Sequence, residues 1–313
     1  GAIFGHIIVN IEETGCRPIE IDELYLGGNQ ASYSVYGYYE SDEVHPVTNK
    51  KIYKPRESAN DTNPVVTFPA LNSHTVPNET THQYDNPILN VISCTRIGKV
   101  FGGGYGSDAK LYGNPTVNIN MIPGAYASQI KRNGTANAHD LGEIGDVYGG
   151  GNAANVIGNP TVNIGTETTV TMTSIDDDSN TNDKDEKHPN VEGAYITGNV
   201  FGGGKLADVG QYNVANDHVD VAGNTYVNIG AVAGDDPATT DVTEEYTSVS
   251  IQGTGYAGIT IGGNVFGGGE GQAIEPTSSA AVDGAFKCAK AIVTGGTNIH
   301  IGNGTINGAL ADR

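Results

Sequence analysis

Residues 100–104 read Val-Phe-Gly-Gly-Gly, and this block decides the fold because it recurs. Three further copies are Val147-Tyr-Gly-Gly-Gly151, Val200-Phe-Gly-Gly-Gly204 and Val265-Phe-Gly-Gly-Gly269. Weaker copies extend the series, and we take them as Ile3-Phe4-Gly5, Leu24-Tyr25-Leu26-Gly27-Gly28 and Gly304-Thr-Ile306-Asn-Gly308. Self-similarity of this kind is the mark of a repeat architecture, in which each copy forms one structural unit.

A second block follows each strong copy and alternates like a β-strand. Its copies are Thr116-Val-Asn-Ile119, Thr161-Val-Asn-Ile164, Thr225-Tyr-Val-Asn-Ile229 and Thr297-Asn-Ile-His-Ile301, with an earlier example at Val9-Asn10-Ile11. The two aliphatic residues lie two apart and share one face, while the Asn between them, or His300 in the last copy, points to the other face. We expect the leading threonines to form a column on the aliphatic, inward face.

A third short strand precedes the glycine block, at Ile97, Ile144, Ile196 and Ile259–Ile261. Glycine suits the corners between strands because it tolerates positive φ and close backbone approach. Three short strands per turn predict an all-β chain that forms a right-handed parallel β-helix, or β-solenoid. We expect one such domain over residues 1–313, with inserted loops of variable length.

Two insertions stand out. Residues 30–90 form a tyrosine-rich excursion, and residues 174–190 form an acidic loop. Tyrosine rings suit sugars and protein partners alike, although packing within a small subdomain explains them equally well. The candidate contact residues of the excursion are Tyr33, Tyr36, Tyr38, Tyr39 and Tyr53.

The acidic loop carries closely spaced oxygen ligands, which could hold calcium. These are Asp176, Asp178, Asp183 and Asp185. The spacing lacks the glycine and terminal glutamate of an EF-hand, so a solvated loop is favoured over a calcium site, and no other cofactor is expected. Cys16, Cys94 and Cys288 form no Cys-x-x-Cys pair and are expected to be small buried hydrophobes, with their disulfide state left open.

The charge balance restricts the partners. The chain has 36 acidic and 16 basic side chains and a net charge of −20, which disfavours nucleic acid. It has no apolar run long enough to span a membrane. Carboxylate pairs for catalysis exist at Glu143 with Asp146, at Asp235 with Asp236 and at Glu244 with Glu245. None recurs in register, so an enzyme is the less favoured interpretation.

The blocks Gly198–Gly204 and Gly223–Gly230 resemble glycine-rich repeat segments of very large secreted or surface proteins of Bacteroidetes-type bacteria. The resemblance covers most of the chain and implies an adhesin-like or scaffold protein outside the cell. It transfers no catalytic residue. The second copy departs from the pattern, because Leu26 replaces its first corner glycine.

We therefore expect a non-catalytic extracellular rod that presents variable loops, as a stalk, adhesin segment or filament subunit. The alternatives are a carbohydrate-active β-helix enzyme, either a polysaccharide lyase or a hydrolase, and a glycan-binding module. Neither end carries an obvious polar cap, so we expect neighbouring repeats of a longer chain or head-to-tail self-association. A glycan or a host surface is the other expected partner.

Overall fold

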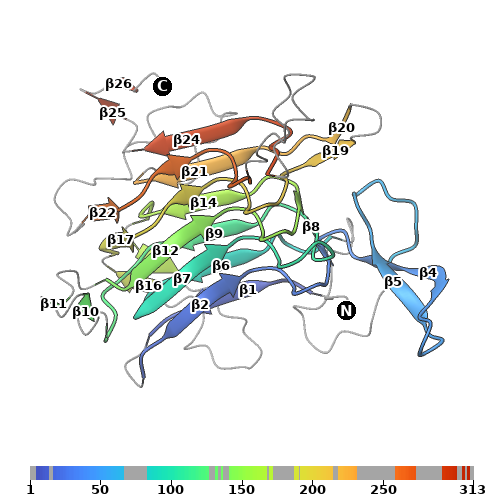
Figure 1. Ribbon diagram of the computed structural model, residues 1–313, viewed down its shortest axis with the longest axis horizontal. Helices are drawn as coiled ribbons and strands as arrows, with labels where there is room; N and C mark the ends of the chain where they lie inside the picture. The colour runs from blue at the N-terminus through green and yellow to red at the C-terminus, as the bar shows by residue number, and fades with distance from the viewer. Residues whose placement is uncertain are drawn as a thin grey trace, which may run out of the picture.

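The computed structural model describes residues 5–13, 17–66, 83–126, 131–132, 135–136, 141–167, 169–171, 187–189, 191–213, 218–230, 258–272, 291–301, 305–306 and 309–310. This part of the chain is all β and contains no helix. Most of its strands pair in parallel, and strands from successive repeats lie side by side in chain order (Figure 1).

The first sheet gathers the Thr-Val-Asn-Ile blocks, as predicted. Its order is β1 (Ile8–Ile11), β6 (Ile88–Val91), β9 (Thr116–Ile119), β14 (Thr161–Ile164), β21 (Thr225–Ile229) and β24 (Thr297–Ile301). Strand β6 reads Ile-Leu-Asn-Val, and the sequence analysis missed it because it lacks the leading threonine. The last residues of the predicted excursion at 30–90 therefore belong to this sheet.

The second sheet contains the glycine-block strands. Its members are β2 (Glu20–Tyr25), β7 (Arg96–Phe101), β12 (Glu143–Tyr148), β17 (Gly193–Ile196) with β18 (Val200–Phe201), and β22 (Gly258–Ile261) with β23 (Val265–Phe266). In β7 and β12 the leading isoleucine and the Val-aromatic pair lie on one continuous strand. The strand predicted to precede each glycine block is thus part of the same wall as the block.

A third parallel sheet, called the third wall below, is short and was not predicted. It consists of β3 (Tyr33–Ser34), β8 (Leu111–Tyr112) and β13 (Val156–Ile157), and single parallel bridges from Val156 to Val209 and on to Val293 extend it. Two-residue strands show no alternation, so periodicity could not reveal them.

Two of the weaker copies are not corner blocks. Gly5 has a φ of 135°, like Gly113 at 147° and Gly158 at 159°, so the first copy matches Leu-Tyr-Gly before a first-sheet strand. Residues 3 and 4 themselves lie outside the described residues. The last copy contributes β25 (Thr305–Ile306), which pairs antiparallel with β26 (Ala309–Leu310).

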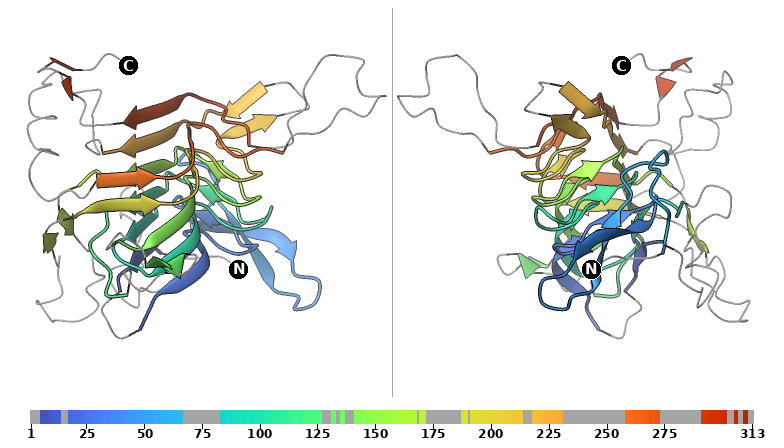
Figure 2. Two further views of the ribbon diagram at one scale, coloured as in Figure 1. Left: turned by 60° about the vertical axis from the view of Figure 1, so that its left-hand side comes forward. Right: turned by 90° about the vertical axis from the view of Figure 1, so that its right-hand side faces the viewer.

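Other antiparallel hairpins branch from the parallel sheets. They are β4 (Tyr38–Val44) with β5 (Lys51–Pro55), β10 (Lys131–Arg132) with β11 (Thr135–Ala136), β15 (Thr169–Thr171) with β16 (Lys187–Pro189), and β19 (Gln211–Asn213) with β20 (His218–Val221). The β4–β5 hairpin projects sideways from the stacked strands (Figure 2).

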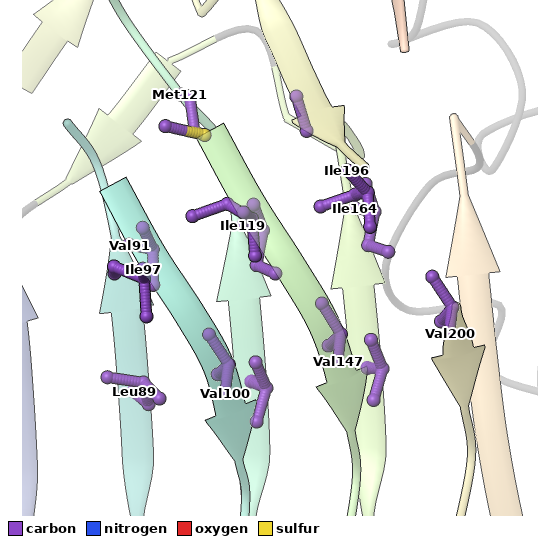
Figure 3. Packing of buried hydrophobic residues seen from close by; sticks show 14 of the residues in the cluster. Leu89, Val91, Ile97, Val100, Ile119, Met121, Val147, Ile164, Ile196 and Val200 are labelled. Carbon is purple, nitrogen blue, oxygen red and sulfur yellow. The ribbon is translucent and has the colours of Figure 1, made fainter. Parts of the chain in front are cut away.

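The main core lies between the first and second sheets, which confirms the predicted aliphatic columns. Leu89, Val91 and Ile119 of one sheet face Val100 and Val147 of the other, and all are fully buried (Figure 3). The predicted inward threonine column is wrong for Thr116 and Thr161, whereas Thr225 and Thr297 do share the aliphatic face. Thr116 and Thr161 share the asparagine face, whereas Thr225 pairs with Thr297 one position earlier.

Two further columns run along the stack. Rings of the glycine blocks stack at 4.7 to 4.9 Å between centroids, in the order Tyr25, Phe101, Tyr148, Phe201 and Phe266. On the first sheet, each asparagine amide donates to the side-chain oxygen of the asparagine before it, at 2.8 to 2.9 Å. This ladder runs through Asn10, Asn90, Asn118, Asn163 and Asn228.

The corner glycines are required for close backbone approach. A Cβ on Gly102 would lie 2.1 Å from the carbonyl oxygen of Gly149, and one on Gly103 would lie 2.6 Å from the amide nitrogen of Gly151. None of the triple glycines has a positive φ. Of the two reasons expected for glycine at these corners, the close approach is the one that applies.

We predict that Gly103→Ala lowers the free energy of unfolding by at least about 1 kcal/mol, because the added methyl group is forced against the backbone of Gly151. Gly268 occupies the same place in its block, yet a Cβ there would meet nothing within 4 Å. Gly268→Ala is therefore the matched control and should leave stability within about 0.5 kcal/mol of the parent. Urea unfolding measures both variants, and equal losses would contradict this explanation.

Candidate binding cleft beside the hairpin

The five candidate tyrosines divide into anchors and exposed rings. Tyr33 and Tyr38 are buried, and their hydroxyls donate to the carbonyl oxygens of Gly5 at 3.0 Å and Ser32 at 2.7 Å. Burial raises the pKa of Tyr33 well above its usual value, so its hydroxyl stays a donor. These two rings hold the hairpin on the sheets. Tyr36 and Tyr39 are half-buried and Tyr53 is exposed, so only they can face a ligand.

Arg56 ties the base of the hairpin together. Its guanidinium donates to the carbonyl oxygen of Tyr36 at 3.0 Å and to that of Asp61, and Ser34 Oγ donates to the Arg56 carbonyl at 2.5 Å. The side chain is buried. A buried cation needs such partners, because leaving it unpaired is costly. The segment from Tyr36 to Asp61 is therefore held as one unit.

A cleft of about 540 Å³ lies where this unit meets the third wall. The hairpin and the residues after it provide one side, and the loop leading into β8 provides the other. The lining residues are Ser32, Tyr39, Lys54, Pro55, Glu57, Ser58, Asp61, Ser107, Asp108, Lys110 and Tyr112. Of the predicted tyrosines only Tyr39 lines it, and Tyr112 was missed because its two-residue strand was missed.

One hydrogen bond crosses the cleft floor. The Tyr112 hydroxyl donates to Glu57 Oε1 at 3.0 Å, which links the third wall to the hairpin segment. Burial, followed by the Glu57 carboxylate, raises the pKa of Tyr112 well above its usual value. The phenol therefore remains a donor at neutral pH and fixes the Glu57 carboxylate.

Asp61 is an acidic residue of the cleft lining. Its Oδ1 accepts hydrogen bonds from the Asn63 backbone N–H at 2.9 Å and the Asn63 amide at 2.8 Å. Burial by itself would raise the pKa of Asp61, but these bonds, helped by the backbone of Glu57 and the charge of Arg56, outweigh burial and lower it. Asp61 is thus an ionised acceptor.

The charges of the hairpin pair locally. Lys54 forms an ion pair with Glu43, and Lys51 lies 3.3 Å from Asp42. The hydrogen bond to Glu43 raises the pKa of Lys54. Exposed pairs of this kind contribute little to stability. The charged residues that line the cleft with Tyr39 carry both signs: Lys54, Lys110, Glu57, Asp61 and Asp108. Such a surface suits a ligand rich in hydroxyls, which can donate and accept at once.

The carboxylates considered for catalysis have structural partners. Asp146 Oδ1 accepts the backbone N–H of Asn199 at 2.9 Å, as a corner cap, and Glu143 is buried. No group of three or more His, Cys, Asp or Glu side chains within the described residues could hold a metal ion. The remaining candidates lie outside those residues: Asp176, Asp178, Asp183, Asp185, Asp235, Asp236, Glu244 and Glu245.

Cys94 is buried and forms no disulfide, as expected of a small hydrophobe, and burial raises the pKa of its thiol to about 12. Cys16 and Cys288 lie outside the described residues. His300 follows Asn228 in register at the end of the asparagine column, as predicted.

Comparison with known proteins gives no relative: no family model, no curated protein and no solved structure matches this chain. Among the described residues there is also no helix with the length and apolar character needed to cross a membrane. The function must therefore be argued from the residues themselves.

We predict that Asp61→Asn destabilises the protein at neutral pH and not at pH 2. Because the folded pKa is lowered, the contribution of Asp61 is present above the ordinary carboxyl pKa of about 3.9 and is lost as the pH falls through the folded value. Thermal unfolding of both proteins at pH 7 and pH 2 measures the difference. A gap in Tm of the same size at both values would show that the ionised carboxylate has no such role.

Proposed function

We propose that the chain is a right-handed β-solenoid and acts as a non-catalytic structural or adhesive rod segment outside a bacterial cell. The observation that carries this proposal is that the register of the stacked strands stays constant while the segments that connect the strands vary in length. Four residues, 92–95, join β6 to β7, whereas the connection from β9 to β12 runs from Ile119 to Glu143 and includes a hairpin. Nevertheless β6 pairs with β9, β9 with β14 and β7 with β12, and none of these pairs shows a register shift.

A rod that presents loops needs this combination. The core columns and the asparagine ladder depend on residues that every turn repeats, so an insertion between strands leaves them intact. The acidic composition fits a soluble, exposed surface. The resemblance to bacterial surface repeats supports the location, and the partners would be neighbouring repeats and a surface ligand.

Deleting one whole turn tests the solenoid. Removal of residues 101–147 joins Val100 to Tyr148 and should leave a folded protein, because β2 can then pair with the fused strand and β6 with β14. As control, removal of residues 105–141 joins β7 directly to β12, which parallel neighbours cannot accommodate without a crossover. Circular dichroism and urea unfolding should show cooperative folding of the first deletion only. If both deletions fold, or the whole-turn deletion does not, the proposed stacking is wrong.

The cleft favours a second candidate, a glycan-binding module that uses the Tyr39 face. Tyr39→Ala should weaken retention on immobilised oligosaccharides at least tenfold, because stacking on an aromatic ring supplies much of the contact area. Tyr53→Ala is the control, since this ring is exposed on the hairpin but does not line the cleft. Equal effects of the two variants would contradict the cleft as the site. New reducing or unsaturated sugar ends would favour the enzyme alternative instead.

A further inference from the structure

The second sheet has two edge strands, and core residues are exposed at one of these edges. Strand β2 lies at one end and β22 with β23 at the other, and each pairs on one side only among the described strands (Figure 1). Beside β22, the core residues are open: Phe266 is 43% exposed, Ile299 40% and Ile301 54%. Their counterparts inside the stack, such as Phe201, Val227 and Ile229, are buried.

A glycine one or two residues after the inward isoleucine faces the preceding strand. A Cβ on Gly98 would lie 2.5 Å from the carbonyl oxygen of Asp22, one on Gly145 would lie 1.9 Å from that of Gly98, and one on Gly263 would lie 2.5 Å from that of Gly198. Real Cβ atoms do not approach oxygen so closely. At Gly98, Gly145 and Gly263 only glycine therefore fits against the strand before it, whereas in the third repeat Thr197 follows Ile196 and the glycine comes one residue later.

Strand β2 has Asp22 at this position, between Ile21 and Glu23, which pair with Ile97 and Lys99. Its Cβ projects to where the carbonyl of a preceding strand would lie. Asp22 and Glu20 also place exposed charge on this edge, which is how natural proteins protect edge strands. These charges and the Cβ of Asp22 therefore disfavour regular head-to-tail stacking through β2.

The opposite face has the features of an interrupted stack. A Cβ on Gly268 would meet nothing within 4 Å, whereas its counterparts Gly103, Gly150 and Gly203 lie against the next strand at 2.6 to 2.8 Å. Asn199 Oδ1 accepts the backbone N–H of Asn264 at 2.9 Å, and Asn264 is the next residue in that column. Phe266 is the last ring of the aromatic column.

We propose that the face formed by β22, β23 and β24 docks a parallel β-strand of a further repeat with the pattern Ile-Gly-Gly-Asn-Val-Phe-Gly-Gly-Gly. Its glycine would allow backbone pairing on β22, its ring would stack on Phe266, and its corner would fill the space beside Gly268. Strand addition of this kind draws affinity from main-chain hydrogen bonds and specificity from side-chain positions. The proposal rests on the solenoid stacking proposed above.

A labelled peptide with the sequence of residues 258–270 tests this docking on the intact chain. Fluorescence anisotropy should show binding, and the peptide with Gly263→Asp should bind at least tenfold more weakly, because its Cβ would collide with the carbonyl of the protein's Gly263, just after β22. In the protein, Phe266→Ala should weaken binding at least tenfold, whereas Tyr25→Ala, at the other end of the same column, should leave it unchanged. Hydrogen exchange should slow over residues 258–266 and not over residues 20–25.

Three results would overturn the docking surface. They are equal binding of the two peptides, slowed hydrogen exchange at residues 20–25 instead of 258–266, and no binding up to about 1 mM peptide, a dissociation constant that corresponds to about −4 kcal/mol. The whole-turn deletion separates the two proposals. If that deletion folds and the peptide does not bind, the solenoid stands and only the docking surface fails.

Discussion

The rest of the structure depends on how closely backbone can approach backbone at the glycine corners. Gly102 and Gly149 leave no room for a Cβ between successive turns, so the corners fix the spacing and direction of every strand that leaves them. Spacing then decides what can stack. Planar rings and asparagine amides both pair well at the separation of neighbouring strands, about 4.8 Å, and both form unbroken columns here.

The columns differ in what they contribute. Full burial of a Val or Ile side chain contributes about 1.5 to 3 kcal/mol, and a neutral hydrogen bond about 0.5 to 1.5 kcal/mol. The aliphatic columns, with residues such as Ile97 and Ile144, therefore provide most of the stabilisation. The Asn118 ladder adds specificity, since a one-residue slip would leave buried amides without partners.

Much of the parallel architecture could be predicted because its residues recur. The recurrence of Val100 at Val147 predicted the pairing in the second sheet, and the recurring Val117 and Ile119 predicted the pairing in the first. The third wall was missed because Leu111–Tyr112 is too short for a period, and β6 was missed because its block, Ile-Leu-Asn-Val, keeps only the asparagine of Thr-Val-Asn-Ile. Gly5 was assigned to the wrong block because a single glycine does not distinguish the two corners, whereas its φ does.

The cleft could not be predicted for the opposite reason. Its lining comes from segments that occur once, the hairpin with Tyr39 and the loop before Tyr112, and their meeting depends on buried contacts of Tyr33, Tyr38 and Arg56. Repetition in the sequence marks what the fold needs in every turn. A residue that occurs once, such as Tyr39 or Asp22 at a position where β7 and β12 have glycine, is not required by the stacking, so such a residue can differ between repeats without disturbing the columns.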